Sequence, residues 1–366
     1  MKTLFYAILY WGSKTVTTRK GNRAIYMTTM EEVLELIRDL TPFEILTLSQ
    51  NLKEMLVSFD LSNFAEDNRF SGGFVCPRCK GKNITRNGKK NGKQRYFCKD
   101  CSHNFMDSTK SIVYKSKYGI EVWSKYIDCM LLGMSLRQSA KRCGIHYKTA
   151  FYWRHKILKS LATYLSKVEL SGIIESDETF VLTNYKGNHT KSSTFVMPRP
   201  PKKRGTAATK RGLSKEQVCI PCMIDRNGNI VSKIAGNGRI TSNQLIQTMQ
   251  DVTIASNSTL VTDKASAYVK FAQAYSLELV SLKSGFEYVR GIYHIQHVNA
   301  FHSKLKKFLR KFNGIATKHL QVYLNWFVWL YKHSEMNAVS MNQKTLGKAV
   351  GNVFKCYYSD VSNIAA

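Results

Sequence analysis

The stretch GIIESDETFVL, residues Gly172 to Leu182, decides the fold because it is an apolar strand with acidic residues in its middle. The apolar stretch QVCIPCMI follows it, and an Asp-Arg-Asn-Gly hairpin signal then leads into NIVSKIAG. A helix from about Ser242 to Asp251 and the strand and helix of STLVTDKASAYVKF come next. This order of strands and helices predicts a mixed α/β sheet.

Two aspartates of this region interrupt or end apolar strands. Asp177 lies inside its strand, where an ionised carboxylate is costly unless it meets a cation. Asp263 closes TLVTD, at the carboxyl end of a strand, where α/β sheets commonly place their sites. Either one alone is more often a cap or an ion-pair partner. As a pair in a basic chain they are candidate ligands for two Mg²⁺ ions, which suits in-line phosphoryl transfer.

A basic amphipathic helix, HVNAFHSKLKKFLRKF, spans His297 to Phe312, and no Asp or Glu occurs from Tyr288 to Ser334. The helix therefore offers no carboxylate to a metal ion, although it supplies many cations for a phosphate backbone. The next stretch, His319 to His333, spaces its aromatic and apolar residues as a helix does, and we expect a core helix covering the sheet.

The formal charge of the chain is +30, from 55 Lys and Arg against 25 Asp and Glu. Nucleic acid is the preferred partner for such a balance, and a basic surface for solubility, a membrane surface or a ribosome are the alternatives. The charge is uneven: Glu31 to Arg69 is acidic, whereas Asn184 to Lys215 holds nine Lys and Arg and no acid. We expect the latter stretch to be a loop that orders on DNA.

Four cysteines occur as CPRC and CKDC with eighteen residues between the pairs, a spacing typical of a zinc ribbon. Two disulfides or unrelated thiols are the alternative, which a cytosolic setting disfavours. The residues between the pairs predict two short strands. The candidate zinc ligands are Cys76, Cys79, Cys98 and Cys101.

The remaining cysteines predict no metal site. Cys219 and Cys222 also form a CxxC, but in a strand residues three apart point to opposite faces and cannot share an ion. We interpret these two, together with Cys129, Cys143 and Cys356, as buried thiols.

The stretch SLRQSAKRCGIHYKTAFYWRHKIL, Ser135 to Leu158, predicts a helix-turn-helix. Ser135 can cap a helix that ends at Gly144, and a second helix starts near Tyr147. An ordinary helical hairpin is the alternative. The expected core is Ala140, Ile145, Ala150 and Trp153, and the expected DNA-facing residues are Lys148, Thr149, Tyr152, Arg154 and His155.

The chain resembles bacterial insertion-sequence transposases of the DDE type, in the branch with a zinc-ribbon N-terminus and Asn as third ligand. The motifs that carry the resemblance are CPRC and CKDC, the helix-turn-helix stretch, SDET, KRG…KRGLSKEQV, the Asp-Arg-Asn-Gly turn, VTDKASAY, and HVNAFHSKLKKFLRKF with the helix after it. They span roughly Cys76 to Phe327.

The resemblance implies an RNase H-like fold and assigns site residues. Its third ligand lies near the start of the helix after the last strand, with a basic residue seven positions later. These positions are Asn299 and Lys306, and 35 residues separate Asp263 from Asn299. His302, Glu175 and Glu178 are rivals for the third place, and Asn299 as a mere N-cap is the plain alternative. Zn would be structural, and Mg or Mn catalytic.

We therefore expect a transposase that binds element ends and cuts and joins double-stranded DNA as a homo-oligomer. A non-catalytic DNA-binding protein and a nuclease or resolvase are the alternatives. The further residues expected to contact DNA are Lys202, Lys203, Arg204, Lys304, Lys307 and Arg310.

The expected organisation has an α/β catalytic domain behind small DNA-binding modules. It comprises an extension (1–26), a helical hairpin (27–69), the zinc ribbon (70–108), the helix-turn-helix domain (109–168), the RNase H-like domain (169–335, with basic loop 184–215) and a C-terminal tail (336–366). The apolar run TLFYAILYW is too short to span a bilayer, so we expect a cytoplasmic protein without membrane contact.

Overall fold

The computed structural model describes residues 37–90, 93–165, 168–188, 196–198, 212–263, 266–283, 285–353, 356 and 361. The chain divides into two compact units, Met1–Ser62 and Asn63–Ala366. The predicted extension and most of the first helix of the predicted hairpin lie outside the described residues.

Helix α3 runs from Pro42 to Phe70. A capping box starts it, because the Thr41 hydroxyl accepts from the Glu44 N–H at 3.4 Å and the Glu44 carboxylate accepts from the Thr41 N–H at 3.0 Å. The helix continues to Phe70, since no Gly or Pro interrupts the chain between Pro42 and Gly72.

A three-stranded antiparallel sheet follows, with the order β1-β2-β3. Its strands are β1 (Ile84–Lys90), β2 (Lys93–Cys98) and β3 (His103–Met106). The sequence predicted the first two strands and missed β3, whose four residues are too short to show alternation. Tyr96 and Phe105 stack at 5.6 Å between ring centroids and form a small core.

Three helices come next: α4 (Ile120–Leu131), α5 (Leu136–Cys143) and α6 (Tyr147–Leu165). Ser135 forms the N-cap of α5 with Gln138, and Gly144 ends it in the left-handed region at φ 63°. These are the caps that the sequence predicted. The four residues expected to form the core here, Ala140, Ile145, Ala150 and Trp153, are all buried.

Part of the predicted C-terminal tail is a packed helix, so that interpretation is corrected. Helix α11 (Ala338–Gly351) buries Leu346, Ala349 and Val350. Its Asn342 amide accepts from the Ser124 hydroxyl at 3.0 Å and donates to the Ser124 carbonyl at 2.9 Å, which fastens α11 to α4. The helix was not foreseen because its buried face also holds Asn342, Thr345 and Gly347, which weaken the apolar periodicity.

The predicted mixed sheet is confirmed, with the strand order β11-β10-β5-β6-β7. Strands β10 (Thr259–Asp263) and β11 (Glu278–Leu282) run parallel to β5 (Ile173–Leu182). Strand β6 (Gln217–Asp225) is antiparallel to β5, and β7 (Ile230–Ser232) is antiparallel to β6 through the predicted Asp-Arg-Asn-Gly turn. The minor strands are β8 (Gly236–Asn237) on β6, β4 (Glu169–Leu170) with β9 (Thr253–Ile254), and β12 (Val289–Arg290) with β13 (Tyr293–His294).

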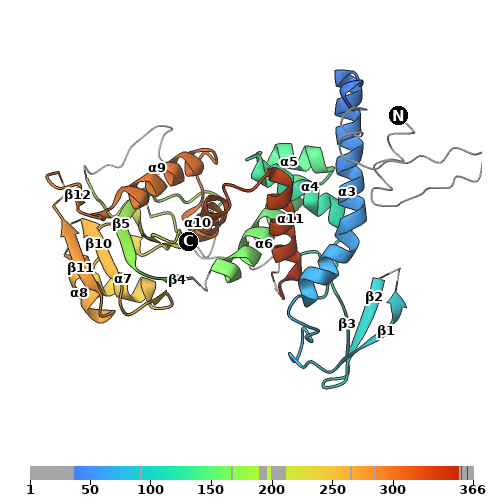
Figure 1. Ribbon diagram of the computed structural model, residues 1–366, viewed down its shortest axis with the longest axis horizontal. Helices are drawn as coiled ribbons and strands as arrows, with labels where there is room; N and C mark the ends of the chain where they lie inside the picture. Colours follow the sequence, from blue (N-terminus) through green and yellow to red (C-terminus); the bar gives the residue numbers. More distant parts are fainter. Residues whose placement is uncertain are drawn as a thin grey trace, which may run out of the picture. The chain divides into compact units, whose positions relative to one another are not determined.

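Helices cover both faces of this sheet (Figure 1). Helices α7 (Ser242–Met249) and α8 (Ala267–Ala274) pack on one face, and α9 (Gln296–Arg310) and α10 (Thr317–Lys332) pack on the other. Cys219 belongs to the first core and Cys222 to the second, which confirms that this CxxC pair points to opposite faces. Cys129 and Cys143 are buried as predicted, whereas Cys356 is only half-buried.

None of the helices in the described part of the chain is long and apolar enough to cross a membrane.

Candidate functional site

Asp177 and Asp263 are neighbours on one face of the sheet. Strands β5 and β10 are parallel, with Val261 opposite Glu175 and Thr262 opposite Ser176. The next step of this register places Asp263 beside Asp177, and the alternation of strands puts both on the side where α9 lies. The sheet therefore brings together two acids that are 86 positions apart in the sequence.

The electrostatics of this pair favour a cation. Burial and the charge of Asp177 raise the pKa of Asp263 above its usual range. The Oδ1 atom of Asp263 is buried and has no hydrogen-bond partner among the described residues. A buried carboxylate oxygen without a partner next to a second carboxylate is the environment that a hard divalent cation relieves.

Helix α9 lies over the acid pair. Val298, Phe301 and Leu305 pack into the core below it. His302 is also buried, and its Nδ1 lies 3.5 Å from the Oδ2 atom of Asp177. His302 was one of the rivals for the third ligand position, and in the structure it contacts Asp177 directly.

Asn299 and Lys306 are exposed and lie about one turn before and one turn after His302 on the same side of α9. The N-cap of the helix is Ile295, so the alternative of Asn299 as a mere cap is wrong. Asn299 sits in the first turn instead, with its amide free for another role. The structure thus groups Asp177, Asp263 and His302, with the two other predicted residues on the same ridge.

The two glutamates that rivalled Asn299 have other surroundings. Glu175 is 1% exposed and accepts the backbone N–H groups of His297 and Val298 at 2.8 and 3.1 Å. Glu178 points to the opposite face of β5, where burial raises its pKa to about 7 despite a hydrogen bond with Tyr268. Glu175 thus shares the α9 face with Asp177, but its oxygens are bound to the start of α9.

A cavity of about 460 Å³ borders this helix. Lys306 and Arg310 supply cations to its wall, and Phe180, Leu309 and Leu320 supply apolar surface. The wall of this cavity therefore carries two cations that can neutralise a phosphate.

The four predicted zinc ligands also converge. Their sulfur atoms all lie within 4.8 Å of one another, and the Cys76–Cys101 and Cys79–Cys98 pairs are 3.7 and 3.6 Å apart. Four thiolates at about 2.3 Å from a zinc ion stand roughly 3.8 Å apart, so this set fits a tetrahedral ion. Lys80 and Ser102, which follow the two pairs, adopt the left-handed region at φ 68° and 53° and close each knuckle.

Comparisons with known proteins find similar sequences. Residues 169–332 match the model of the ISXO2-like transposase domain. A protein of Halobacterium salinarum described as an uncharacterized protein in transposable element ISH50 is 26% identical over 274 residues, which cover 73% of this chain and 88% of that protein. The matched residues contain the six-stranded sheet and the acid pair.

Solved structures similar to the chain include complexes of the Mos1 transposase. The pre-cleavage Mos1 transpososome is 12% identical, with 66% of this chain and 81% of that chain covered and a TM-score of 0.20. The Mos1 paired end complex with Mg is also 12% identical, with the same coverage and a TM-score of 0.25. Scores this low do not establish a shared fold.

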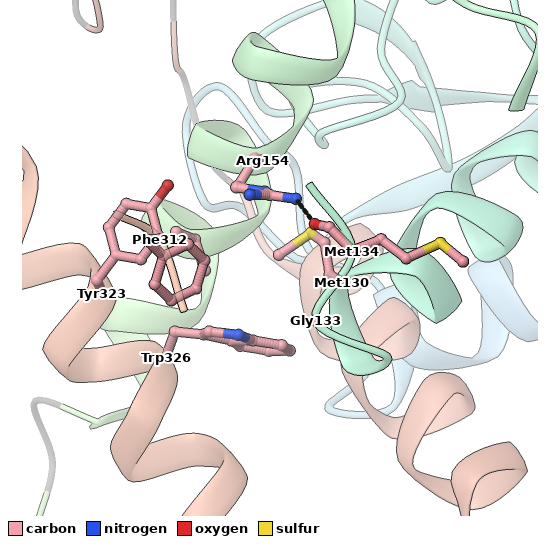
Figure 2. A pocket seen from close by; sticks show the side chains of 8 residues that line it. Met130, Gly133, Met134, Arg154, Phe312, Tyr323 and Trp326 are labelled. Carbon is pink, nitrogen blue, oxygen red and sulfur yellow. Dashed lines mark hydrogen bonds between the residues drawn. The ribbon is translucent and has the colours of Figure 1, made fainter. Parts of the chain in front are cut away.

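Helix α6 exposes fewer of the candidate DNA-contacting residues than the sequence predicted. On α6, Lys148 is exposed and Thr149 and Tyr152 are half-buried. Arg154 and His155 are 5% and 1% exposed, which corrects their placement on the DNA-facing side. Figure 2 shows Arg154 turned inward, where its Nη2 donates to the Met134 carbonyl at 2.8 Å.

The physical reason is that α10 covers this side of α6. The rings of His155 and His319 lie 4.3 Å apart between centroids. Burial and the neighbouring His319 lower the pKa of His155 to about 3, so its imidazole is neutral at neutral pH and offers no charge to phosphate.

The remaining predicted DNA contacts divide by location. Lys304, Lys307 and Arg310 are exposed on α9. Lys202, Lys203 and Arg204 lie outside the described residues. The sequence missed Arg226, His294 and His297, which surround Glu175, although the Asp-Arg-Asn-Gly turn was a signal for the first of them.

Proposed function

We propose that the chain is a transposase of the DDE type with Asn as its third ligand, built on an RNase H-like catalytic domain. The observation that carries this proposal is the placement of Asp263 beside Asp177 on the sheet face covered by α9. The match of residues 169–332 to the ISXO2-like transposase domain supports it.

Asp177, Asp263 and the amide oxygen of Asn299 would hold Mg²⁺ or Mn²⁺. These are hard oxygen ligands, and the unpartnered Oδ1 of Asp263 fits such an ion. When bound, the ions would activate the attacking oxygen and stabilise the leaving oxygen of the phosphodiester.

The protein's own residues would orient this chemistry. His302 contacts Asp177 and fixes its carboxylate, while Lys306 binds a phosphate of the DNA strand at the edge of the basic cavity. Two carboxylates neutralise the ions less completely than three would, so DNA phosphates complete the metal site.

The remaining modules would hold the DNA. The four cysteines bind a structural zinc ion, and the α5–α6 pair acts as a helix-turn-helix with Lys148, Thr149 and Tyr152 toward DNA. We propose that double-stranded element ends and target DNA are the substrates, and that the chain acts as a homo-oligomer because two ends are joined together.

The test is strand transfer on an oligonucleotide substrate that carries the terminal sequences flanking the gene, with Mg²⁺ present. Asp177→Ala and Asp263→Ala should each lower the rate by about 10³-fold or more, since each removes several kcal/mol of transition-state stabilisation. Asp251→Ala is the matched control and should keep the rate, because this carboxylate is exposed and pairs with Lys233.

Product analysis separates the alternatives. Covalent donor–target products identify a transposase, and cleavage without joining identifies a nuclease. A wild-type chain that binds the ends but cleaves with neither Mg²⁺ nor Mn²⁺ would contradict the proposal and indicate a non-catalytic DNA-binding protein.

A further inference from the structure

The turn between β6 and β7 is built to hold one side chain in place. Asp225 accepts the N–H and the amide group of Asn229 at 2.8 and 3.0 Å and the Ser171 N–H at 3.2 Å. Gly228 takes φ 78°, which a side chain would strain. The residue inside this fixed turn is Arg226, whose Nη2 donates to the Ile292 carbonyl at 3.1 Å.

The Glu175 carboxylate contacts both Arg226 and the start of α9. The Oε1 atom of Glu175 lies 2.9 Å from Arg226 Nη1 and 2.6 Å from His297 Nδ1. Its Oε2 atom accepts the N–H groups of His297 and Val298. Both oxygens of a carboxylate that is 1% exposed are thus committed to the start of α9 and to the turn.

Glu175 replaces the cap that α9 lacks. The N-cap residue, Ile295, has no side-chain oxygen to accept an N–H of the first turn. His294 Nδ1 accepts the Gln296 N–H at 3.3 Å, which leaves the His297 and Val298 N–H groups for another acceptor. A carboxylate from β5 satisfies two of them and interacts favourably with the helix dipole. This contact fixes the start of α9 relative to a strand position two residues before Asp177.

A metal ion is the rival explanation for this cluster, because Glu175, His294 and His297 offer ligand atoms within 4.8 Å of one another. Arg226 Nη1 stands 2.9 Å from the Glu175 carboxylate, 2.7 Å from His297 Nδ1 and 3.0 Å from His294 Nε2. The guanidinium already supplies the positive charge at the centre of the group. It would repel a second cation there.

We infer that Glu175, supported by Arg226, is a positioning residue that sets how far Asn299 stands from Asp177. Val298, whose N–H it holds, immediately precedes Asn299, and Asp177 is on the same strand face as Glu175. Glu175 thereby couples the two ends of the metal site without binding the metal. This inference rests on the proposed function and gives the Asp-Arg-Asn-Gly turn a role.

The experiment is a Mg²⁺ titration of strand transfer with the full chain. Glu175→Gln keeps the shape but places an amide NH₂ against backbone donors, and it should raise the Mg²⁺ concentration at half-maximal rate roughly 10- to 100-fold, as changes to groups that orient metal ligands do. Binding of end DNA should be unchanged. Glu278→Gln, on an exposed site of β11, is the control and should titrate as wild type.

Arg226→Gln keeps the test decisive if Glu175→Gln fails to fold, since Arg226 is 27% exposed and its loss leaves the helix start capped. It should shift the midpoint in the same direction by a smaller factor. Wild-type midpoints for both variants overturn the inference. Two zinc ions per wild-type chain, falling to one in Glu175→Gln, would also overturn it in favour of a metal site. Failure of the proposed function is separate, because then the wild-type chain itself shows no strand transfer.

Discussion

The four cysteines and the two aspartates are both candidate ligand sets, but the chain assembles them differently. Cys76 and Cys101 are 25 positions apart, and each CxxC pair comes from a single tight turn. Asp177 and Asp263 meet only because β5 and β10 pair in parallel across 86 positions. The first set depends on local geometry and the second on the whole sheet.

This difference decides what a metal ion does in each place. The ribbon has a core of a few side chains around Tyr96 and Phe105, which is too little to stabilise an independent module. The sheet has a core on each face, from Ile174 and Phe271 on one side to Val298 and Leu324 on the other. We therefore expect zinc to be needed for folding and magnesium only for chemistry.

Removal of the zinc ion should have the largest effect on folding. Cys98→Ser should abolish zinc binding and unfold the ribbon, because structural zinc contributes about 10–16 kcal/mol of apparent binding energy in zinc-finger peptides. The measurement is zinc content per chain, together with limited proteolysis of residues 71–110. The unfolding transition of the sheet should remain.

Cys222→Ala is the matched control, because Cys222 is also part of a CxxC but is buried against Ser232 at 3.3 Å. It should keep one zinc ion per chain. A ribbon that stays protease-resistant after Cys98→Ser would mean that its apolar core is sufficient, and the contrast between the two sites would fail.

The same contrast explains what the sequence could predict. The cysteine spacing predicts the candidate zinc ligands because each CxxC turn is local, and the caps at Ser135 and Gly144 could be predicted for the same reason. Asp177 and Asp263 stood out as charges in apolar strands, although only the register places them side by side. From the sequence, Glu175 was a rival metal ligand. Its actual partners could not be predicted, because they come from a turn and a helix far along the chain.

Asp263→Asn tests the cost of the acid pair. It should lower strand transfer by about 10³-fold while raising the free energy of unfolding at pH 7, by at most about 1 kcal/mol after solvent screening. Burial and Asp177 raise the pKa of Asp263, so the folded state favours its protonated form. Wild-type stability thus falls as pH rises from the unfolded value of about 3.9 through the raised pKa.

The measurement is denaturant unfolding of both proteins across this pH range. The two curves should agree at the lowest pH and separate above it, with the variant more stable. A variant less stable than the wild type at pH 7 would show that a partner in the folded protein stabilises the Asp263 carboxylate. The acid pair would then be prearranged for its ligand, as the four cysteines are.

Helix α6 shows where sequence reasoning failed. Its basic and aromatic residues predicted a DNA-facing side, but Arg154 and His155 pack under α10, which begins more than a hundred and fifty residues later at Thr317. The neighbouring sequence does not distinguish a basic side chain that binds phosphate from one that donates a hydrogen bond to a buried carbonyl. On α9 the cations stayed exposed because one face already carried the core residues Val298, Phe301 and Leu305.

The smallest expected effect is a shift of the Mg²⁺ midpoint when the charge of the proposed metal site is changed. Asn299→Asp would bring a third carboxylate and should lower the Mg²⁺ midpoint of strand transfer roughly five- to tenfold, since a unit charge close to a partly buried ion is worth about 1–3 kcal/mol before screening. Stability should change little, because Asn299 is exposed in the first turn of α9, where an acid is tolerated.

Asn257→Asp makes the same charge change in an exposed turn at the other end of β10 and should leave the midpoint unchanged. An Asn299→Asp midpoint equal to wild type would place Asn299 away from the metal, and the acid pair would then need a ligand from elsewhere in the chain.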